Sequence, residues 1–370
     1  MKRRDFLIST AAALATGKPG VFGQLPGAGG GSRQLRCDLA VIGGGVGGVA
    51  AALAALRNGL KVILTEETDW IGGQLTQQAV PPDEHQWIEE FGATRTYRRF
   101  RAAVRDYYRE WYPLVESARN DPFLDPGNCG VSRICHEPRA ALAVLTAMLA
   151  DEASSGNLTI LTDTVPRAAE VDRDRVISLL VRNTAEGTDT VISSPWFIDA
   201  TEHGDLLPLT KTEYVTGAES KDQTGEPHAA DACDPRNIQA ATWCFAVDYL
   251  EGEDHTIDRP DQYGFWRDYI PRLSPEWPGR MLSWTYSNPI TLQPFTLGFD
   301  PRNGAMNPGF WSYRRLIDPA NFRGSKPSGI TLVNWPMNDY VEGGLFDLPP
   351  EEVEKHLEGA RQQSLSLLYW

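Results

Sequence analysis

The sequence contains no Cys-x-x-Cys motif, and its five cysteines stand at positions 37, 129, 135, 233 and 244. A zinc ribbon and a thioredoxin-type redox pair both need closely spaced cysteines, so neither is indicated. The odd number also excludes a framework in which every cysteine is paired. Cys129 and Cys135 are close enough in the sequence to form a disulfide, but buried free thiols are the expected state.

Positive charge is also scarce. The chain has 35 Lys and Arg against 49 Asp and Glu, which gives a net charge of −14. This balance disfavours non-specific binding to nucleic acid or to an anionic membrane, so no nucleic-acid partner is expected. The histidines and acids do not cluster at the spacing of metal ligands, and the sequence therefore predicts no metal site.

The first 34 residues have the composition of an export signal. Arg3 and Arg4 precede an apolar stretch from Phe6 to Ala15, and a glycine- and proline-rich spacer follows from Gly17 to Ser32. The apolar stretch is too short to span a bilayer in the mature chain. The segment resembles a twin-arginine signal, which predicts transport by the twin-arginine export machinery to the periplasm or the extracellular space. That route carries folded proteins and suits one that acquires a cofactor before export.

The stretch from Leu39 onward predicts a strand, a tight turn and a helix. Leu39–Ile42 is a short apolar run of the kind found in buried parallel strands. Gly43, Gly45 and Gly48 then form a G-x-G-x-x-G motif. In this motif the first glycine permits the turn, the second lets the backbone approach a pyrophosphate, and the third lets the helix pack closely on the strand.

The residues after the motif complete a dinucleotide-binding unit. The predicted helix Val46–Asn58 is rich in alanine, and its N-terminus presents free N–H groups to phosphates. A second apolar strand, Lys61–Thr65, leads to Glu66, about 20 residues after the first glycine. A carboxylate at this place accepts hydrogen bonds from ribose hydroxyls. Strand, turn, helix and acid together therefore predict a dinucleotide site.

Three later stretches favour FAD over NAD as the nucleotide. Trp70–Thr76 contains a glycine pair that lets a loop fold back over the cofactor. Leu158–Leu161 and Val176–Val181 are strand-like, and they predict a strand on the adenine side followed by a small β-ribbon. Trp196–Thr201 predicts another buried strand, which returns the chain to the cofactor. An NAD-dependent dehydrogenase is the alternative.

The chain resembles the FAD-dependent oxidoreductases related to the glutathione-reductase-like flavoproteins, in their exported bacterial branch. The resemblance runs from about residue 35 to the end and depends on the stretches CDLAVIGGGVGGVAAALAAL, ETDWIGGQLT, VSRICHEPRAAL, WFIDATEHGDLLPLTKTEYVTGAES and ITLVNWPMNDY. It implies an α/β fold with a Rossmann-like FAD-binding lobe (three-layer ββα) and an inserted α+β substrate lobe.

The resemblance also implies which residues bind FAD. Those expected at the pyrophosphate are Gly43, Gly45, Val46 and Gly48, with Glu66 at the ribose and Val165 on the adenine side. Those expected along the rest of the cofactor are Gly73, Gln74, Thr201, Gly204 and Asp205.

The expected domain organisation follows the same resemblance. The export signal and linker cover residues 1–34, the FAD lobe 35–82 and 136–205, a helical insertion 83–135, the substrate lobe 206–345, and a helix returning to the FAD lobe 346–370.

The C-terminal end departs from the family pattern. The resemblance implies a last strand, a glycine-rich turn and a helix that close the FAD lobe, and none of them follows Pro350. Residues 351–370 instead predict one amphipathic helix that ends on an apolar run. We therefore expect a truncated chain, and a non-catalytic FAD-binding remnant is a further alternative. Leu367, Leu368 and Trp370 are expected to expose apolar surface.

Between residues 97 and 111 the sequence predicts a basic, aromatic helix, which we interpret as a solvated amphipathic helix that packs its aromatic side chains. Candidate walls of a substrate pocket are Trp243, Trp284, Trp311, Trp335 and Tyr340, although packing is the expected role of each.

For the chemistry, His203 is the best-placed base, because it lies beside the strand that returns to the cofactor. His228 and His255 are alternatives, and a structural or surface role is the expected one for each histidine. The sequence thus predicts an exported FAD-dependent oxidoreductase that transfers a hydride from a small organic substrate to flavin N5. Its substrate and its electron acceptor are not identified.

Overall fold

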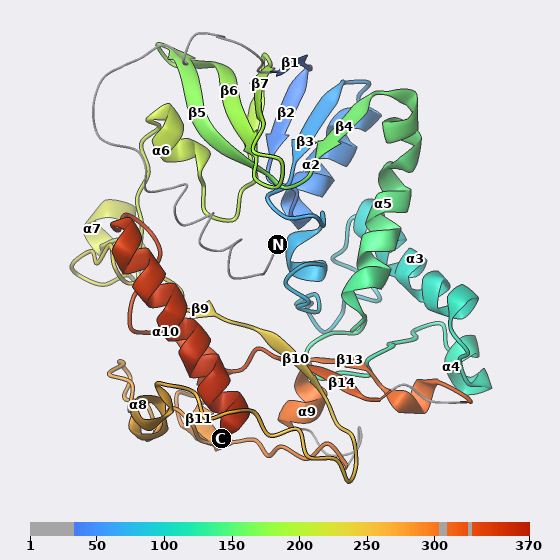
Figure 1. Cartoon of the computed structure of the whole chain (residues 1–370), viewed down its shortest axis with the longest axis vertical. Helices are drawn as coiled ribbons and strands as arrows, with labels where there is room; N and C mark the ends of the chain where they lie inside the picture. The colour runs from blue at the N-terminus through green and yellow to red at the C-terminus, as the bar shows by residue number, and fades with distance from the viewer. Residues whose placement is uncertain (1–32, 303–308, 325–327) are drawn as a thin grey trace. The chain divides into compact units, whose positions relative to one another are not determined.

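The computed structural model describes residues 33–302, 309–324 and 328–370 (Figure 1). These residues form two compact units. The first comprises the described residues up to Gln78 together with Ala141–Val215, and the second comprises Ala79–Ala140 and Thr216–Trp370. Apart from Arg33 and Gln34, the predicted export segment lies outside the described residues.

A parallel sheet forms the centre of the first unit. Its strands, in the order β4-β3-β2-β8, are β4 (Leu158–Leu161), β3 (Val62–Thr65), β2 (Leu39–Ile42) and β8 (Phe197–Asp199). The inner strands β2 and β3 are wholly buried. The strand predicted at 196–201 is shorter than expected and only half-buried, because β8 lies at an edge of the sheet.

A second sheet packs against the first within this unit. Its order is β1-β7-β6-β5, and its strands are β1 (Arg33–Arg36), β7 (Asp189–Ser193), β6 (Arg175–Asn183) and β5 (Thr164–Asp172). Apolar residues of both sheets and of helix α6 (Leu206–Thr210) share one core: Ala40, Ile42, Ile63, Leu179, Val181, Ile192 and Leu206. The helix α2 (Val46–Arg57) packs on β2 and β3, as Figure 1 shows. The predicted Rossmann-like α/β fold is confirmed.

The predicted strand–helix–strand unit forms nearly as expected. Helix α2 begins at Val46 and ends at Arg57, where Asn58 and Gly59 close it through N–H bonds to Ala55 and Leu56. Further on, the loop predicted around Gly72 contains a short 3-10 helix, η1 (Gly73–Leu75), and the long helix α5 (Pro138–Ser155) precedes β4.

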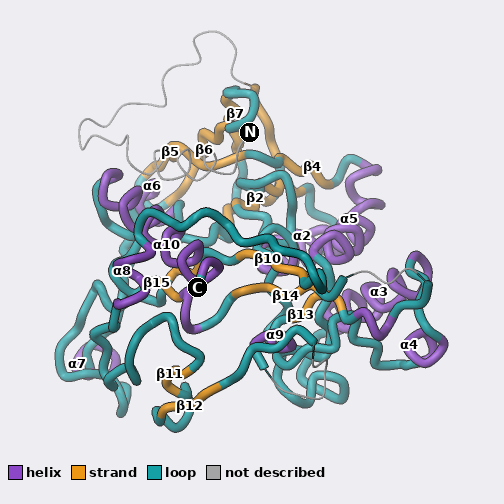
Figure 2. Tube along the Cα trace, turned by 60° about the horizontal axis from the view of Figure 1, so that its bottom comes forward, coloured by secondary structure: helices purple, strands orange, loops and turns teal. Residues whose placement is uncertain are grey.

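The second unit is rich in loops and short strands (Figure 2). A small antiparallel sheet has the order β10-β14-β13. The other elements of the second unit are helices and short pairs of strands. The bounds are α3 (Arg95–Trp111), α4 (Glu116–Asn120), α7 (Lys221–Thr224), β9 (Ala241–Thr242), β10 (Phe245–Asp248), α8 (Tyr263–Asp268), β11 (Thr285–Ser287), β12 (Pro294–Thr296), α9 (Phe310–Tyr313), β13 (Arg315–Ile317), η3 (Pro319–Asn321), β14 (Ile330–Val333), η4 (Pro336–Asn338), β15 (Asp339–Tyr340) and α10 (Pro350–Tyr369).

Aromatic side chains form much of the core of the second unit. Trp335 and Tyr340 are buried in it, while Trp243 and Trp284 pack against it partly exposed. Trp311 is likewise buried. These contacts confirm packing as the role of these side chains.

The helix α3 is less solvated than the sequence predicts. Thr94 caps its N-terminus by accepting a hydrogen bond from the Tyr97 N–H. Two of its basic side chains, Arg101 and Arg105, are buried, because the carboxylates of Glu84 and Glu89 lie against them. The interpretation as a solvated face is therefore wrong at these two positions.

The C-terminal helix α10 forms as predicted and packs on α8, η4 and β15. Leu367 is buried in the aromatic core, so the expected exposure is wrong there. Leu368 and Trp370 remain about two-fifths exposed, and the Trp370 ring lies 4.9 Å from that of Trp284. No helix among the described residues is both long and apolar enough to cross a membrane.

The cysteines correct another expectation. Cys129 and Cys135 form a disulfide, with their Cα atoms 6.0 Å apart. Asp125 explains why they meet, because its carboxylate accepts the backbone N–H of both residues. Cys37, Cys233 and Cys244 form no disulfide within the described part of the chain.

Candidate nucleotide-binding site

The glycine-rich turn between β2 and α2 has no room for side chains at two places. Gly43 has a φ of +101°, and a Cβ there would lie 2.1 Å from the Ala200 carbonyl oxygen. A Cβ on Gly48 would lie 1.9 Å from the Gly43 carbonyl oxygen. The first glycine therefore makes the turn, and Gly48 lets the helix approach it, as the motif predicts.

The N-terminus of α2 faces this turn without a side-chain cap. Gly45 is the N-cap residue, and neither a capping side chain nor an acidic residue occupies the first turn. The first N–H groups of a helix have no acceptor within the helix, and the dipole makes this end partly positive. The turn can therefore bind an anionic group through its backbone.

Glu66 is held in place below the turn. Its Oε2 accepts the Gly44 N–H at 3.1 Å, and its Oε1 accepts the N–H and the hydroxyl of Thr68 at 2.9 and 2.7 Å. The side chain is buried, and burial raises its pKa above the ordinary range. Because a carboxylate offers about four acceptor positions, these three bonds orient the group and leave capacity for a further donor.

The segment after β8 is fixed by a chain of local hydrogen bonds. The Asp199 Oδ1 accepts the N–H and hydroxyl of Thr201 at 3.0 and 2.7 Å, and the Thr201 hydroxyl accepts the Asp205 N–H at 2.8 Å. The Oδ1 atom of Asp205 is buried and has no hydrogen-bond partner in the described part of the chain. Such an orphaned acceptor indicates that a ligand donor can complete the site.

A pocket brings these elements together. The predicted residues that line it are Gly43, Gly45, Glu66, Val165, Thr201 and Asp205. Other predicted residues support this lining: Gly48 packs beneath Gly43, and a Cβ on Gly73 would lie 3.0 Å from the Gly45 Cα. Val46 and Gly204 lie next to lining residues in the sequence without lining the pocket themselves, and Gln74, in η1, does not line it either.

The pocket also contains residues that the sequence analysis did not select. They are Gly44, Thr65, Glu67, Gln77, Thr164, Pro166, Ala200 and Glu202. Most of them are sequence neighbours of a residue that the sequence analysis predicted. Their position at the end of a strand could therefore have indicated that they line the pocket. Gln77 carried no such signal, because it belongs to the loop after η1 and reaches the pocket only through the folding back of that loop.

The electrostatics of the pocket are dominated by acids. Glu66, Glu67, Glu202 and Asp205 all line it, and no Lys or Arg is among the described lining residues. Burial raises the pKa of Glu67 to about 7, and the charges of Glu66, Asp205 and Glu202 add to the effect. Burial likewise raises the pKa of Asp205. An anionic ligand must therefore be bound through backbone N–H groups against this repulsion.

We predict that Glu67→Gln stabilises the chain at alkaline pH. The folded-state pKa of Glu67 is raised to about 7, so its proton stabilises the folded state at acid pH, and this contribution is lost as the pH rises through 7. At about pH 8 the variant should gain about 2 kcal/mol in the free energy of unfolding, and near pH 4, below both pKa values, it should gain nothing. Urea denaturation at both pH values measures this.

The exposed Asp69 in the same loop provides the matched control, since Asp69→Asn should change the unfolding free energy little at either pH. An equal gain from Glu67→Gln at both pH values would contradict the titration of Glu67.

The proposed base lies at the edge of this region. His203 is exposed, and its charge favours the ionised form of Asp205. His228 and His255 are exposed too, and His255 pairs with Glu253 at 2.7 Å. Among the described residues, Asp125, Cys129 and Cys135 come together as possible metal ligands, but the two cysteines are bonded to each other.

The fold and the pocket define a dinucleotide-binding protein of the Rossmann type. Over residues 38–370 the chain matches the family described as FAD dependent oxidoreductase. The chain belongs to this family, and FAD is the cofactor that the family implies.

Solved structures share part of the chain at low identity. Mycobacterium smegmatis Sdh1 in complex with UQ1 is 11% identical over 45% of this chain and 34% of its own, with a TM-score of 0.31. L-proline dehydrogenase from P. horikoshii is 16% identical over 47% of this chain and 24% of its own, with a TM-score of 0.25. Glycerol-3-phosphate dehydrogenase from Bacillus halodurans, complexed with FAD, is 17% identical over 45% of this chain and 34% of its own, with a TM-score of 0.29.

The chain therefore spans between about a quarter and a third of the length of these three structures. A search of the curated proteins gave no match.

The pocket residues fit the nucleotide part of FAD. The Gly45 position is open, because the only atom near a Cβ there would be Glu202 Oε1 at 3.0 Å, and this leaves a backbone cradle beside the helix N-terminus. The oriented carboxylate of Glu66 and the orphaned oxygen of Asp205 supply acceptors for hydroxyl groups.

Proposed function

We propose that this member of the FAD dependent oxidoreductase family oxidises a small organic substrate. The observation that carries the proposal is the pocket, in which a glycine cradle at a helix N-terminus stands next to two acceptor carboxylates. When bound, FAD supplies the acceptor of a hydride at its N5 atom.

In this proposal each group of residues has one task. The backbone at Gly43, Gly45, Val46 and Gly48 binds the pyrophosphate, Glu66 accepts from the ribose, and Val165 contacts the adenine side. Gly73, Gln74, Thr201, Gly204 and Asp205 lie along the rest of the cofactor. His203 takes a hydroxyl or amine proton from the substrate.

The organisation of the chain in this proposal is the one expected from the sequence. Residues 35–82 and 136–205 bind FAD, residues 83–135 are a helical insertion, and residues 206–345 contact the substrate. The proposed route to the periplasm or the extracellular space is twin-arginine export, and electrons pass to an acceptor that the sequence does not identify.

The absorbance spectrum of the purified chain tests the cofactor part. The bands of oxidised flavin, with FAD released on denaturation, are expected. Nicotinamide-dependent turnover without these bands would support an NAD-dependent dehydrogenase instead. A panel of alcohols and amines is then mixed with the protein without oxygen, and loss of the flavin absorbance (bleaching) reports reduction. If the chain binds flavin but no compound in the panel bleaches it, a non-catalytic FAD-binding chain is supported.

For the proposed base, His203→Gln is expected to retain FAD and to slow anaerobic bleaching by at least about 100-fold at neutral pH. A glutamine cannot accept a proton, although it keeps similar polarity and size. Stopped-flow absorbance with the substrate found in the panel measures the rate. His228→Gln, at a second exposed histidine, is the matched control, and equal rates in wild type and His203→Gln would refute the role.

A further inference from the structure

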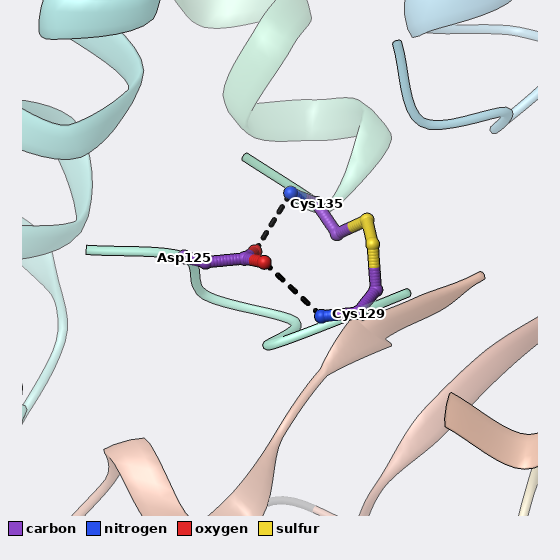
Figure 3. Close-up of side chains that lie close together, drawn as sticks. All are labelled: Asp125, Cys129 and Cys135. Carbon is purple, nitrogen blue, oxygen red and sulfur yellow. Dashed lines mark hydrogen bonds between the residues drawn. A yellow bond between two sulfur atoms is a disulfide. The ribbon is translucent and has the colours of Figure 1, made fainter. Parts of the chain in front are cut away.

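A disulfide and a carboxylate form a second chemical group in the second unit. Figure 3 shows the Asp125 side chain pointing toward the loop closed by Cys129 and Cys135. One carboxylate oxygen and the two sulfur atoms lie within 4.8 Å of one another. The FAD site uses none of these residues.

The carboxylate of Asp125 connects the two cysteines through the backbone. Its Oδ1 accepts the Cys135 N–H at 2.7 Å, and its Oδ2 accepts the Cys129 N–H at 3.0 Å, as dashed lines mark in Figure 3. The Gly127 N–H also donates to Oδ1, at 3.2 Å. Both cysteines therefore stay close together whether or not their sulfur atoms are bonded.

Contacts from β13 and η3 hold the same loop. The buried guanidinium of Arg315 donates to the carbonyl oxygens of Gly127 and Asn128 at 2.7 and 2.9 Å. The Asn321 amide donates to the Asp125 and Pro126 carbonyl oxygens at 2.9 and 3.1 Å. These contacts fix the loop independently of the S–S bond, and a disulfide that closes so short a loop contributes less than one that closes a long loop.

The two cysteines of the disulfide differ in exposure to solvent. Cys129 is half-buried, whereas Cys135 is fully buried. An external thiolate can therefore reach Cys129 first, and the electron pair of the broken bond goes to Cys135. A thiolate left there would be buried beside a carboxylate, so a proton must reach it as the bond breaks.

Burial favours an Asp125 carboxyl group that holds a proton near neutral pH. Burial raises its pKa to about 7, although the hydrogen bonds from the backbone at Cys129, Cys135, Asn128 and Gly127 oppose this. The guanidinium of Arg315, which pairs with Asp318 at 2.9 Å, also attracts the Asp125 carboxylate and so opposes the effect of burial. Arg105 of α3 donates to the carbonyl oxygen of the preceding residue, Leu124.

We propose that Cys129–Cys135 is a thiol–disulfide exchange site for a dithiol reductant, in which Asp125 delivers the proton to the buried sulfur. A reductant thiolate bonds to Cys129 Sγ, the S–S bond breaks, and Cys135 Sγ takes the electron pair and the Asp125 proton. The second thiol of the reductant then displaces Cys129 as a thiolate, which is protonated from solvent. The reductant leaves as a disulfide and Asp125 takes a new proton from solvent, so the chain has gained two electrons and two protons.

Reduction of the folded protein by dithiothreitol tests the site. After timed reduction, free thiols are alkylated and the peptides with Cys129 and Cys135 are quantified by mass spectrometry. We expect complete, reversible reduction without denaturant and an unchanged circular dichroism spectrum. If the two thiols appear only when urea unfolds the chain, the bond is structural and the proposal is wrong.

The pH dependence of the reduction rate tests whether Asp125 donates a proton or whether the reductant merely reaches the disulfide. The rate constant per dithiothreitol thiolate should fall about tenfold from about pH 6 to about pH 8.5 in the wild type, as Asp125 loses its proton. Asp125→Asn should remove this slope, while Asp121→Asn, at a nearby exposed acid, should keep it. An unchanged pH slope of the rate constant in folded Asp125→Asn would overturn the proposal. If that variant does not fold, the pH profile of the wild type decides, because a rate constant that does not change with pH overturns the proposal as well.

Discussion

Gly45→Ala is expected to weaken FAD binding on the order of 100-fold while the apoprotein remains folded. A Cβ at this position meets only the end of the flexible Glu202 side chain, at 3.0 Å, so the apoprotein can accommodate it. The same Cβ would occupy the cradle where the backbone must approach the pyrophosphate. Titration of FAD into the apoprotein, followed by flavin fluorescence, measures the dissociation constant.

Gly47→Ala is the matched control, because it lies two residues away in the same helical turn and a Cβ there meets nothing within 4 Å. It should retain the wild-type affinity and add slight helix stability. Equal losses of FAD affinity in both variants would mean that any added side chain at the N-terminus of α2 weakens binding, whatever its position. Full affinity in Gly45→Ala would place the pyrophosphate elsewhere.

Arg101→Met is expected to reduce the free energy of unfolding by about 3–5 kcal/mol at neutral pH. Arg101 is buried, and it donates to Glu84 at 2.7 Å and to Glu89 at 2.8 Å. Its removal leaves the Glu84 carboxylate, only 2% exposed, without a cationic partner at this distance. Urea denaturation measures the loss, and Arg109→Met, whose partner Asp106 is exposed, should cost less than about 1 kcal/mol.

The cost of Arg101→Met should also depend on pH. Burial alone would raise the pKa of Glu89, but the hydrogen bonds and charges of Arg101 and Arg105 lower it to about 2. A lowered pKa stabilises the folded state above the unfolded-state pKa, and this contribution is lost as the pH falls toward 2. The difference between wild type and variant should therefore narrow between about pH 5 and pH 2.5. If the difference in unfolding free energy between wild type and Arg101→Met stays constant with pH, the loss comes from the packing of the long arginine side chain.

Local sequence patterns predicted the nucleotide-binding unit because its geometry depends on near neighbours. The turn at Gly43, the close approach at Gly48 and the strand β3 follow from residues within one short stretch. The amphipathic helix α10 was predictable for the same reason, since helical spacing is a local property.

Predictions failed where the partners of a side chain lay outside its own helix. The apolar end of α10 suggested exposure, but Leu367 is buried by aromatic residues from several loops. The basic face of α3 suggested solvent, but Glu84 and Glu89 precede the helix and pair with it.

The sequence by itself determined the class of fold, the family and the nucleotide-binding turn, because glycine placement and apolar periodicity act over a few residues. Only the tertiary structure decided that four carboxylates surround the pocket and that Asp125 holds Cys129 and Cys135 together. Burial raises the pKa of Glu67 and of Asp125, neighbouring carboxylates add to the effect at Glu67, and these surroundings exist only when the chain folds.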